Sequence, residues 1–308
     1  MTTYTQIVNF FHTSMIADAI GVPVEFRLRD RYNVTGMTGH GTYNQPAGTW
    51  SDDSSLTLAL AETLVQGEGP NELMLRFAAY LTTGDYTPAG VCFDIGNTTR
   101  TAILRSVDAG VRATAAGLRS PAANGNGALM RVAPLAFALK RLAWPARRAQ
   151  ITAYTSMTHG HERSIIASCL YVETLRELLA GRELTAALAA AWAEIASSGF
   201  SNAELAEFDQ LMAPQFLAKP RTAIHSSGYV IDSLEAAVWC AGNAMTLADA
   251  MLTAANLGED TDTIAQIAAC LYQAGHLTEQ APASWQQQLI RTPQSEQIIT
   301  HFAQRFGD

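Results

Sequence analysis

The sequence GTWSDD at residues 48–53 places a hydroxyl and two adjacent carboxylates directly before the apolar run LTLAL at residues 56–60. Serine and aspartate are favoured at helix N-termini, where they satisfy free backbone N–H groups, so these residues predict the start of a buried helix. The sequence GEDTDT at residues 258–263 repeats that chemistry about two hundred residues later, ahead of the apolar residues 264–271. We therefore expect a fold that brings two acidic helix N-termini together around cations.

Helical spacing of apolar residues recurs along the whole chain, and no alternating strand pattern of convincing length competes with it. The clearest stripe is formed by Leu247, Ala250, Met251, Ala254 and Ala255, at i, i+3, i+4, i+7 and i+8. The pattern predicts an all-α bundle in a single compact domain, residues 1–308. The candidate helices span residues 3–20, 53–67, 70–83, 96–108, 127–140, 145–158, 161–181, 183–197, 201–212, 229–241, 246–256, 261–275 and 284–305.

The composition is that of a folded domain with an acidic balance of charge. Of 308 residues, 48% are hydrophobic and 16% are charged, enough to bury a sizeable core. The formal net charge of −8 argues against nonspecific nucleic-acid binding, which needs a concentrated positive field. The N-terminus has no basic region, and no apolar run of about 18 residues or more occurs, so we expect neither a signal peptide nor a membrane span. We expect a cytoplasmic protein.

Two further features bear on organisation. The four cysteines lie far apart without a C-x-x-C motif, and we expect reduced thiols, mostly in the core. Residues 33–50 are rich in Gly, Thr and Asn and are too long for a simple connector, so we expect them to form part of a site.

Each acidic cluster, taken alone, is better interpreted as a helix cap. Both clusters, however, combine paired carboxylates with adjacent hydroxyls, and carboxylates gathered in a partly buried place cannot all stay ionised without a compensating cation. Ligation by oxygen alone selects Mg²⁺, Mn²⁺ or Ca²⁺ over zinc, and four carboxylates would neutralise two divalent ions. The clusters therefore predict a cation site, with Mg²⁺ as the first choice.

Two other acids have both a structural and a chemical interpretation. Glu25 lies between Val24 and Phe26, after a helix that ends at glycine and proline. It is either an exposed loop residue or a desolvated carboxylate whose raised pKa suits proton transfer. Asp94 and Asn97 lie at the start of a predicted helix, where capping is the simpler explanation.

The sequence NGNG at residues 124–127 is typical of a turn, because Gly and Asn tolerate positive φ angles. Before a helix, such a loop also presents N–H groups to a phosphate. His159 and His161 lie close together, but no third ligand is nearby, so we do not expect a zinc site there.

Seven motifs taken together resemble the ADP-ribosylglycohydrolase family, which includes the dinitrogenase-reductase-activating glycohydrolase and the ADP-ribosyl-arginine hydrolases. They occur in the family's order, and the resemblance covers nearly the whole chain, from residue 18 to about residue 271. In this sequence they are ADAIGVPVEF (17–26), SDDS (51–54), DIGNT (94–98), GNGALMR (125–131), TH (158–159), SGYVIDSLEAA (227–237) and GEDTDT (258–263). The chain departs from the family pattern at Ala17, Ser51, Ser233 and Glu259, the last in place of a glycine.

The resemblance implies an all-helical orthogonal bundle with two Mg²⁺ ions, Mn²⁺ being the alternative. The implied metal ligands are Ser51, Asp52, Asp53, Asp260, Asp262 and Thr263. Glu25, Asp94 and Asp262 are the implied catalytic residues: Glu25 as an acid/base or metal-linked carboxylate, and Asp94 as the partner of a guanidinium. The residues implied to line the ADP-ribose pocket are Asn97, Asn124, Gly125, Asn126, Gly127 and His159.

The resemblance thus implies a monomeric or weakly associating hydrolase that releases ADP-ribose from an ADP-ribosylated protein, with arginine as the modified side chain. Asp94 is the only sequence feature that favours arginine over ADP-ribosyl-serine, O-acetyl-ADP-ribose or another conjugate. A different class stays open as well, an immunity-type protein that blocks a toxin by contact without catalysis. The intact Asp52, Asp53, Asp260 and Asp262 argue against that alternative.

Overall fold

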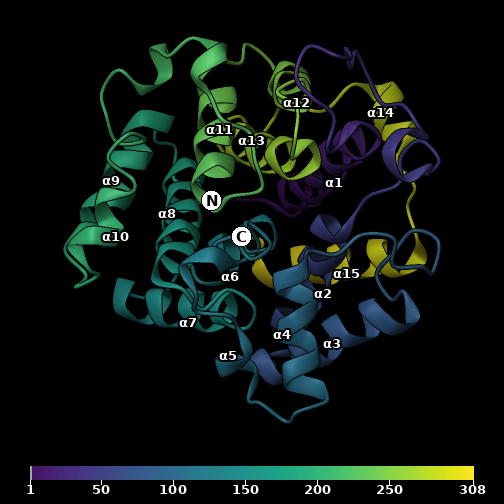
Figure 1. Cartoon of the computed structure of the whole chain (residues 1–308). Helices are drawn as coiled ribbons and strands as arrows, with labels where there is room; N and C mark the ends of the chain where they lie inside the picture. The colour runs from purple at the N-terminus through teal and green to yellow at the C-terminus, as the bar shows by residue number, and fades with distance from the viewer. Residues whose placement is uncertain (1) are drawn as a thin grey trace.

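The computed structural model describes residues 2–308, and within them the secondary structure consists of α-helices and short 3₁₀ turns without a β-strand. The all-α prediction is confirmed (Figure 1). The α-helices are α1 (Tyr4–Gly21), α2 (Asp52–Gln66), α3 (Pro70–Thr83), α4 (Asn97–Val107), α5 (Ala113–Ala116), α6 (Leu135–Ala138), α7 (Trp144–Ser156), α8 (Glu162–Leu179), α9 (Leu184–Ala196), α10 (Asn202–Ala206), α11 (Val230–Asn243), α12 (Leu247–Ala255), α13 (Thr261–Gly275), α14 (Ala283–Gln288) and α15 (Pro293–Phe306).

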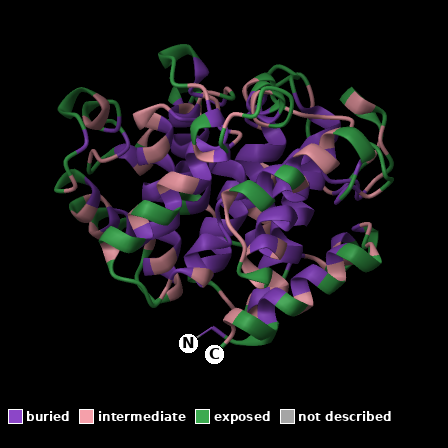
Figure 2. Ribbon diagram, turned by 90° about the horizontal axis from the view of Figure 1, so that it is seen from below, coloured by how far each residue is buried: buried purple, intermediate pink, exposed green. Residues whose placement is uncertain are grey.

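The most extensive helix contact in the fold is that of α1 with α13. Helices α11 and α12 pack against α13 from the C-terminal half of the chain, while α15 lies against both α1 and α2. Helix α8 connects this centre to α7 and α9 (Figure 1). Buried residues run through the middle of the molecule, and exposed residues are confined to outer helix faces and loops (Figure 2). The apolar stripes found in the sequence therefore face one continuous core.

Helix α1 joins the two acidic helix N-termini to each other. In the last turn of α1, the Asp18 carboxylate accepts hydrogen bonds from the backbone N–H groups of Ser51 (3.0 Å) and Ser54 (3.0 Å) at the start of α2. At the end of α1, the Gly21 carbonyl accepts a hydrogen bond of 2.9 Å from the Thr261 hydroxyl at the start of α13. A buried anion at a helix N-terminus is stabilised by unpaired N–H groups and by the helix dipole. One helix thereby sets the positions of both clusters.

Gly21 allows α1 and α13 to approach each other closely. A Cβ atom at this position would lie 2.3 Å from the Cα of Asp262, well inside van der Waals contact with the backbone of α13. Any larger residue would therefore push the start of α13 away from α1. The glycine that looked like a helix terminator in the sequence is also required by helix packing.

Helix α1 is also the most apolar long helix of the chain. Residues Tyr4–Val24 are long and apolar enough to cross a membrane, yet 83% of the relevant stretch is buried inside the protein. The expectation that no such segment exists was therefore too strict. Burial among α13, α15 and α2 accounts for its apolar composition, because a helix that is hydrophobic all round belongs in a core.

Three predicted helices are wrong in extent. The predicted helix 127–140 is broken into a 3₁₀ turn (Leu129–Arg131) and the short α6, because Pro134 has no N–H to continue a helix. The predicted helix 284–305 is divided into α14 and α15 at Pro293, which takes the first helical position of α15. The predicted helix 201–212 ends at Ala206 and continues as turns.

The packing at Gly21 makes a direct prediction. We expect Gly21→Ala to lower the free energy of unfolding by roughly 1–3 kcal/mol or more, the usual cost of overpacking a core. Gly275→Ala is a matched control, because Gly275 is also the last residue of its helix and a Cβ there would make an ordinary contact of 3.6 Å with Leu178. Urea denaturation of both variants checks this, and equal stabilities for the two would show that the helices can separate without cost.

Candidate active site

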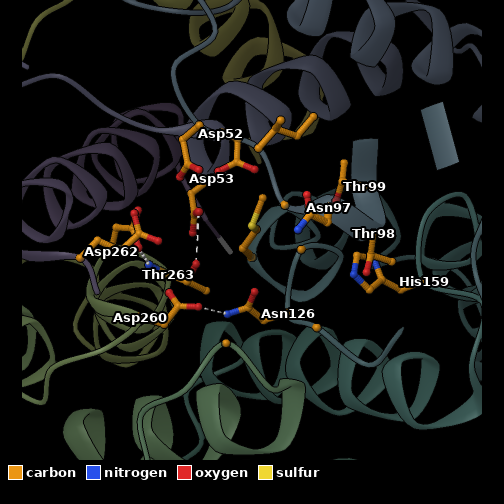
Figure 3. A pocket seen from close by; sticks show the side chains of 18 of the residues that line it. Asp52, Asp53, Asn97, Thr98, Thr99, Asn126, His159, Asp260, Asp262 and Thr263 are labelled. Carbon is orange, nitrogen blue, oxygen red and sulfur yellow. Dashed lines mark hydrogen bonds between the residues drawn. The ribbon is translucent and has the colours of Figure 1, made fainter. Parts of the chain in front are cut away.

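The two acidic clusters meet at one pocket with a volume of about 320 Å³. Figure 3 shows the aspartates of α2 and α13 on one side of this pocket, and Asn97 and His159 on the other. We refer to these sides as the acidic end and the donor end. The residues that line the pocket are Glu25, Phe26, Asp52, Asp53, Asp94, Ile95, Gly96, Asn97, Thr98, Thr99, Gly125, Asn126, Gly127, Met130, His159, Gly228, Asp260, Asp262 and Thr263.

The acidic end is built from the N-termini of α2 and α13. Asp52 and Asp53 are the first two residues of α2, and Asp262 lies in the first turn of α13. The two helices are joined directly, because the Thr263 hydroxyl donates a hydrogen bond of 3.2 Å to the Asp53 carboxylate (Figure 3). The predicted meeting of the two clusters is therefore seen in the structure.

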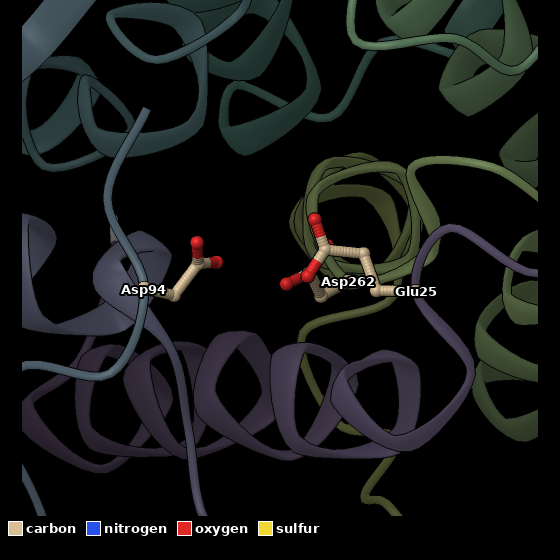
Figure 4. A group of neighbouring side chains, drawn as sticks. All are labelled: Glu25, Asp94 and Asp262. Carbon is tan, nitrogen blue, oxygen red and sulfur yellow. The ribbon is translucent and has the colours of Figure 1, made fainter. Parts of the chain in front are cut away.

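Two acids from loops complete the acidic end. Carboxylate oxygens of Glu25, Asp94 and Asp262 lie within 4.8 Å of one another (Figure 4). Asp94 was expected to hold a guanidinium, and the structure places it beside the acid/base candidate Glu25. Such a distance suits either a shared cation or a cationic side chain that enters the pocket.

Unusual backbone geometry positions Glu25 and Asp260. Phe26 and Glu259, the residues next to these acids, both have positive φ angles, 62° and 61°. Their backbones are joined by a hydrogen bond of 2.6 Å from the Phe26 N–H to the Glu259 carbonyl. A left-handed conformation costs free energy for residues with a side chain, so this connection is maintained by the surrounding structure. The side chain of Glu259 is exposed and does not line the pocket, so its carboxylate does not join the acidic end.

Burial and mutual repulsion both raise the pKa values of these acids. The pKa of Glu25 is raised to about 9, chiefly by burial and next by the charge of Asp94, with smaller effects from the other acids. The pKa of Asp94 is raised to about 6, also chiefly by burial. The pKa values of Asp52, Asp53 and Asp262 are raised well above the ordinary value by burial and by their acidic neighbours. The protein alone therefore holds protons at this end, which a bound cation would displace.

The acidic end has the properties of a cation site. One oxygen each of Glu25 and Asp260 is buried without a hydrogen-bond partner. No lysine or arginine is among the pocket-lining residues within the described part of the chain. The available donors are carboxylate and hydroxyl oxygens, which are the ligands of Mg²⁺, Mn²⁺ and Ca²⁺. The residues present therefore fit a hard divalent cation.

The donor end is formed by a loop, a helix start and a histidine. Helix α4 begins at Asn97 without a side-chain cap, so its first N–H groups are free to bind a ligand. Asn126 reaches back to the acidic end, donating hydrogen bonds to Asp260 (2.7 Å) and Ser233 (2.9 Å). Gly125 and Gly127 face the His159 ring, and a Cβ at Gly127 would lie 3.1 Å from that ring. This end therefore offers N–H donors but no charged group.

The ADP-ribosylglycohydrolase family model matches residues 2–308. The chain belongs to the ADP-ribosylglycohydrolase family. Two ADP-ribosylarginine hydrolases named Tri1 are similar to it: that of Pseudomonas putida (strain GB-1), at 33% identity over 88% of this chain and 70% of the relative, and that of Serratia proteamaculans (strain 568), at 33% identity over 90% and 73%. The ADP-ribosyl-[dinitrogen reductase] glycohydrolase of Rhodospirillum rubrum is 26% identical over 88% of this chain and 85% of that protein.

The fold comparison agrees with the family assignment. A solved structure described as an ADP-ribosylglycohydrolase-related protein complex superposes with a TM-score of 0.79 at 27% sequence identity, covering 97% of this chain and 96% of the other. The resemblance found in the sequence motifs is thus confirmed. The protein is a glycohydrolase of a metal-dependent family, with a buried acidic cluster in its pocket.

Two residues predicted for the ADP-ribosylglycohydrolase site are not among those that line the pocket. Ser51 is the N-cap of α2, and its hydroxyl accepts a hydrogen bond of 3.2 Å from the Asp53 N–H. Asn124 is buried behind the loop, where its side chain bonds to Ser164 (2.8 Å) and His161 (3.1 Å). In this structure both residues therefore support their neighbours and do not face the pocket.

Other residues important to the site were not predicted. Asp18 was identified in the sequence only as part of a motif. A charged residue inside an apolar helix is a signal of a buried interaction, because charged side chains are rarely buried without a partner. Tyr43, from the loop predicted to help form a site, lies beside Glu25 and Asp94 and lowers the pKa of each through its hydroxyl. Its ring contacts Phe93 at a centroid distance of 5.1 Å. No sequence pattern indicated that contact.

The raised pKa values predict how pH and metal act on stability. Glu25 titrates near 4.5 when unfolded and near 9 in the metal-free fold, so its contribution to stability is complete below the unfolded value and is lost as pH rises toward 9. We expect the Tm of the metal-free protein to fall between pH 6 and pH 9. Added Mg²⁺ or Mn²⁺ should restore it and release protons, measurable by calorimetry in buffers of different ionisation enthalpy.

Glu25→Gln serves as the control for this experiment. The amide cannot titrate, so the variant should show a weaker fall of Tm with pH and should release fewer protons when the metal binds. A metal-free Tm that is flat with pH, together with metal binding that releases no protons, would contradict the cation site.

Proposed function

We propose that this ADP-ribosylglycohydrolase cleaves the N-glycosidic bond between ADP-ribose and an arginine side chain of a modified protein. The observation that carries the proposal is the Asp94 carboxylate, which lies with Glu25 and Asp262 in a pocket whose described lining contains no cationic side chain. A guanidinium is a planar cation, and a carboxylate is its natural bidentate partner. The names of the two Tri1 relatives support the same linkage.

We propose two Mg²⁺ ions as the cofactor, with Mn²⁺ as the alternative. Asp52, Asp53, Asp260, Asp262 and Thr263 would hold them, and Ser51, the sixth expected ligand, would support them from outside the pocket through the hydrogen bond that its hydroxyl accepts from the Asp53 N–H. This proposal is supported by the all-oxygen donor set and by the buried carboxylate oxygens that lack a partner. When bound, such ions polarise substrate hydroxyls and lower the pKa of a water molecule.

The protein's own groups would carry the proton. A water oxygen forms a bond to C1″ of the ribose as the bond from C1″ to the guanidine nitrogen breaks, through a transition state with oxocarbenium character. One proton passes from the water to a carboxylate, for which Glu25 and Asp262 are the candidates. The guanidine leaves with the bonding electron pair, and its nitrogen then takes up that proton from the carboxylate. Asp94 would orient the leaving group throughout.

The donor end would bind the rest of the nucleotide. Phosphate oxygens are suited to the free N–H groups at the start of α4, to the backbone of residues 125–127 and to His159. The absence of charged groups at this end among the described lining residues leaves hydrogen bonds as the means of recognition. The proposed substrate is therefore held between a cation-binding end and an N–H-donating end.

We also propose that the protein acts as a monomer in the cytoplasm and binds neither nucleic acid nor membranes. Its four cysteines are free thiols, which suit a reducing compartment. The net charge of −8 would disfavour contact with nucleic acid. The partner in this proposal is the ADP-ribosylated protein.

Asp94→Asn tests the arginine linkage. The amide keeps the size of the side chain but removes the charge that pairs with a guanidinium, and such charge-assisted contacts are typically worth about 1.5–3 kcal/mol. We expect kcat/KM on ADP-ribosyl-arginine peptide to fall about 10- to 100-fold. The affinity for free ADP-ribose should change much less. Asp108→Asn, at the exposed other end of α4, is the matched control and should behave as wild type.

Side-by-side assays on arginine-linked and serine-linked ADP-ribose peptides, with and without Mg²⁺, decide between linkages. Faster release from the serine-linked peptide by wild type, or an equal loss on both peptides in Asp94→Asn, would remove arginine from the proposal. Absence of ADP-ribose release from either peptide would instead favour a protein that acts by binding alone.

A further inference from the structure

Behind the donor end lies a fully buried arginine. Arg131 is 1% exposed, and its hydrogen bonds within residues 2–308 go to carbonyl and hydroxyl oxygens, with no carboxylate among them. Its guanidinium lies 5.0 Å from the centre of the Phe77 ring. A buried unpaired cation is costly, so its hydrogen bonds have to compensate for lost hydration. Arg131 takes no part in the proposed bond cleavage.

The hydrogen bonds of Arg131 lead to the pocket. It donates to the carbonyls of Gly127 and Tyr154, and it donates a hydrogen bond of 2.8 Å to the Thr158 hydroxyl. The Thr158 oxygen in turn lies 2.8 Å from Nδ1 of His159. Arg131 thus contacts both walls of the donor end, the glycine loop directly and the histidine through one hydroxyl.

The direction of these bonds determines where the histidine carries its proton. Arginine can only donate, so the Thr158 oxygen accepts from Arg131 and keeps its own hydrogen free. Thr158 is 0% exposed, and His159 Nδ1 is the acceptor found for that hydrogen within residues 2–308. If Nδ1 were protonated instead, the buried hydroxyl hydrogen would have no partner, which is unfavourable. Nδ1 is therefore the acceptor.

A neutral histidine that accepts at Nδ1 carries its hydrogen on Nε2. Burial, with the nearby Arg131 as a second cause, lowers the pKa of His159 to about 3, so the ring stays neutral at physiological pH. Nε2 lies toward Gly125 and Gly127, where a Cβ would come within 3.6 Å of it. His159 lines the pocket at this side, opposite the acids (Figure 3).

We propose that Arg131 and Thr158 are positioning residues that hold His159 as the Nε2–H tautomer, so that its hydrogen points into the pocket as a fixed donor to a phosphate oxygen of the nucleotide. The identity of the acceptor rests on the proposed function, whereas the tautomer does not. A neutral donor binds the phosphate in both substrate and product. The hydrogen-bond relay from Arg131 through Thr158 to His159 therefore acts on nucleotide affinity more than on bond cleavage.

The tautomer is tested in the ligand-free protein. Long-range ¹H–¹⁵N correlation spectra of ¹⁵N-histidine-labelled wild type, with the His159 signals assigned by their loss in His159→Asn, distinguish a protonated from an unprotonated ring nitrogen. We expect protonated Nε2 and unprotonated Nδ1 at pH 7. A protonated Nδ1 would overturn the proposal, whether or not any variant folds and whether or not the enzyme releases ADP-ribose.

The relay is tested by removing the hydroxyl. In Thr158→Val, Nδ1 loses its donor, and we expect the tautomer signals to shift and the Kd for free ADP-ribose to rise about 10-fold or more, as for loss of a hydrogen bond to a charged group. KM for the peptide substrate should rise by a larger factor than kcat falls. Thr158→Ser keeps the hydroxyl and should restore both the spectrum and the affinity.

Thr155→Val is the matched control, because Thr155 is equally buried one turn earlier and its hydroxyl has no hydrogen-bond partner. It should bind ADP-ribose as wild type does. Unchanged affinity in Thr158→Val, or an equal loss in Thr155→Val, would overturn the relay. A wild type with the expected tautomer that fails to release ADP-ribose would count against the proposed function only.

Discussion

Six carboxylates line one pocket of this protein, and the structure depends on how these mutually repelling groups are held together. Helix α1 positions the two clusters, because Asp18 caps the start of α2 while Gly21 lets α13 approach to backbone contact, although the charge of Asp18 itself adds to the repulsion on Asp52 and Asp53. Asp52, Asp53 and Asp262 then lie in the first turns of α2 and α13, where helix dipoles and free N–H groups favour negative charge. The protein does not compensate all of this negative charge, as the raised pKa values of the acids and the carboxylate oxygens without hydrogen-bond partners indicate. The uncompensated negative charge is suited to a cationic ligand.

The pocket that results is chemically divided. Its acidic end can attract cations and a guanidinium, whereas its donor end presents neutral N–H groups suited to an anion. An ADP-ribosylated arginine has the matching order of groups, with a guanidinium next to the ribose and phosphates further along. Asn126 connects the two ends, because its side-chain amide donates a hydrogen bond to Asp260.

Much of this architecture could be predicted from the sequence. The apolar stripes gave the long helices to within a few residues, and the matched acid and hydroxyl content of SDDS and GEDTDT pointed to their meeting. Local sequence patterns did not predict the features of the structure that depend on tertiary contacts. Pro134 and Pro293 break stretches whose apolar spacing looked continuous, and Asn124 turns away from the pocket because Ser164 and His161 bind it. Tyr43 and Arg131 act across long sequence separations, which no single-sequence pattern records.

The most direct measurement of the central claim is anomalous X-ray diffraction from crystals of the wild-type protein soaked in Mn²⁺. The account predicts two strong peaks at the acidic end, bound by carboxylates from both α2 and α13 at about 2–2.3 Å, the range for a hard cation and oxygen. Peaks bound to only one of the two helices, or confined to acids on the protein surface, would contradict the claim that the two clusters form one cation site.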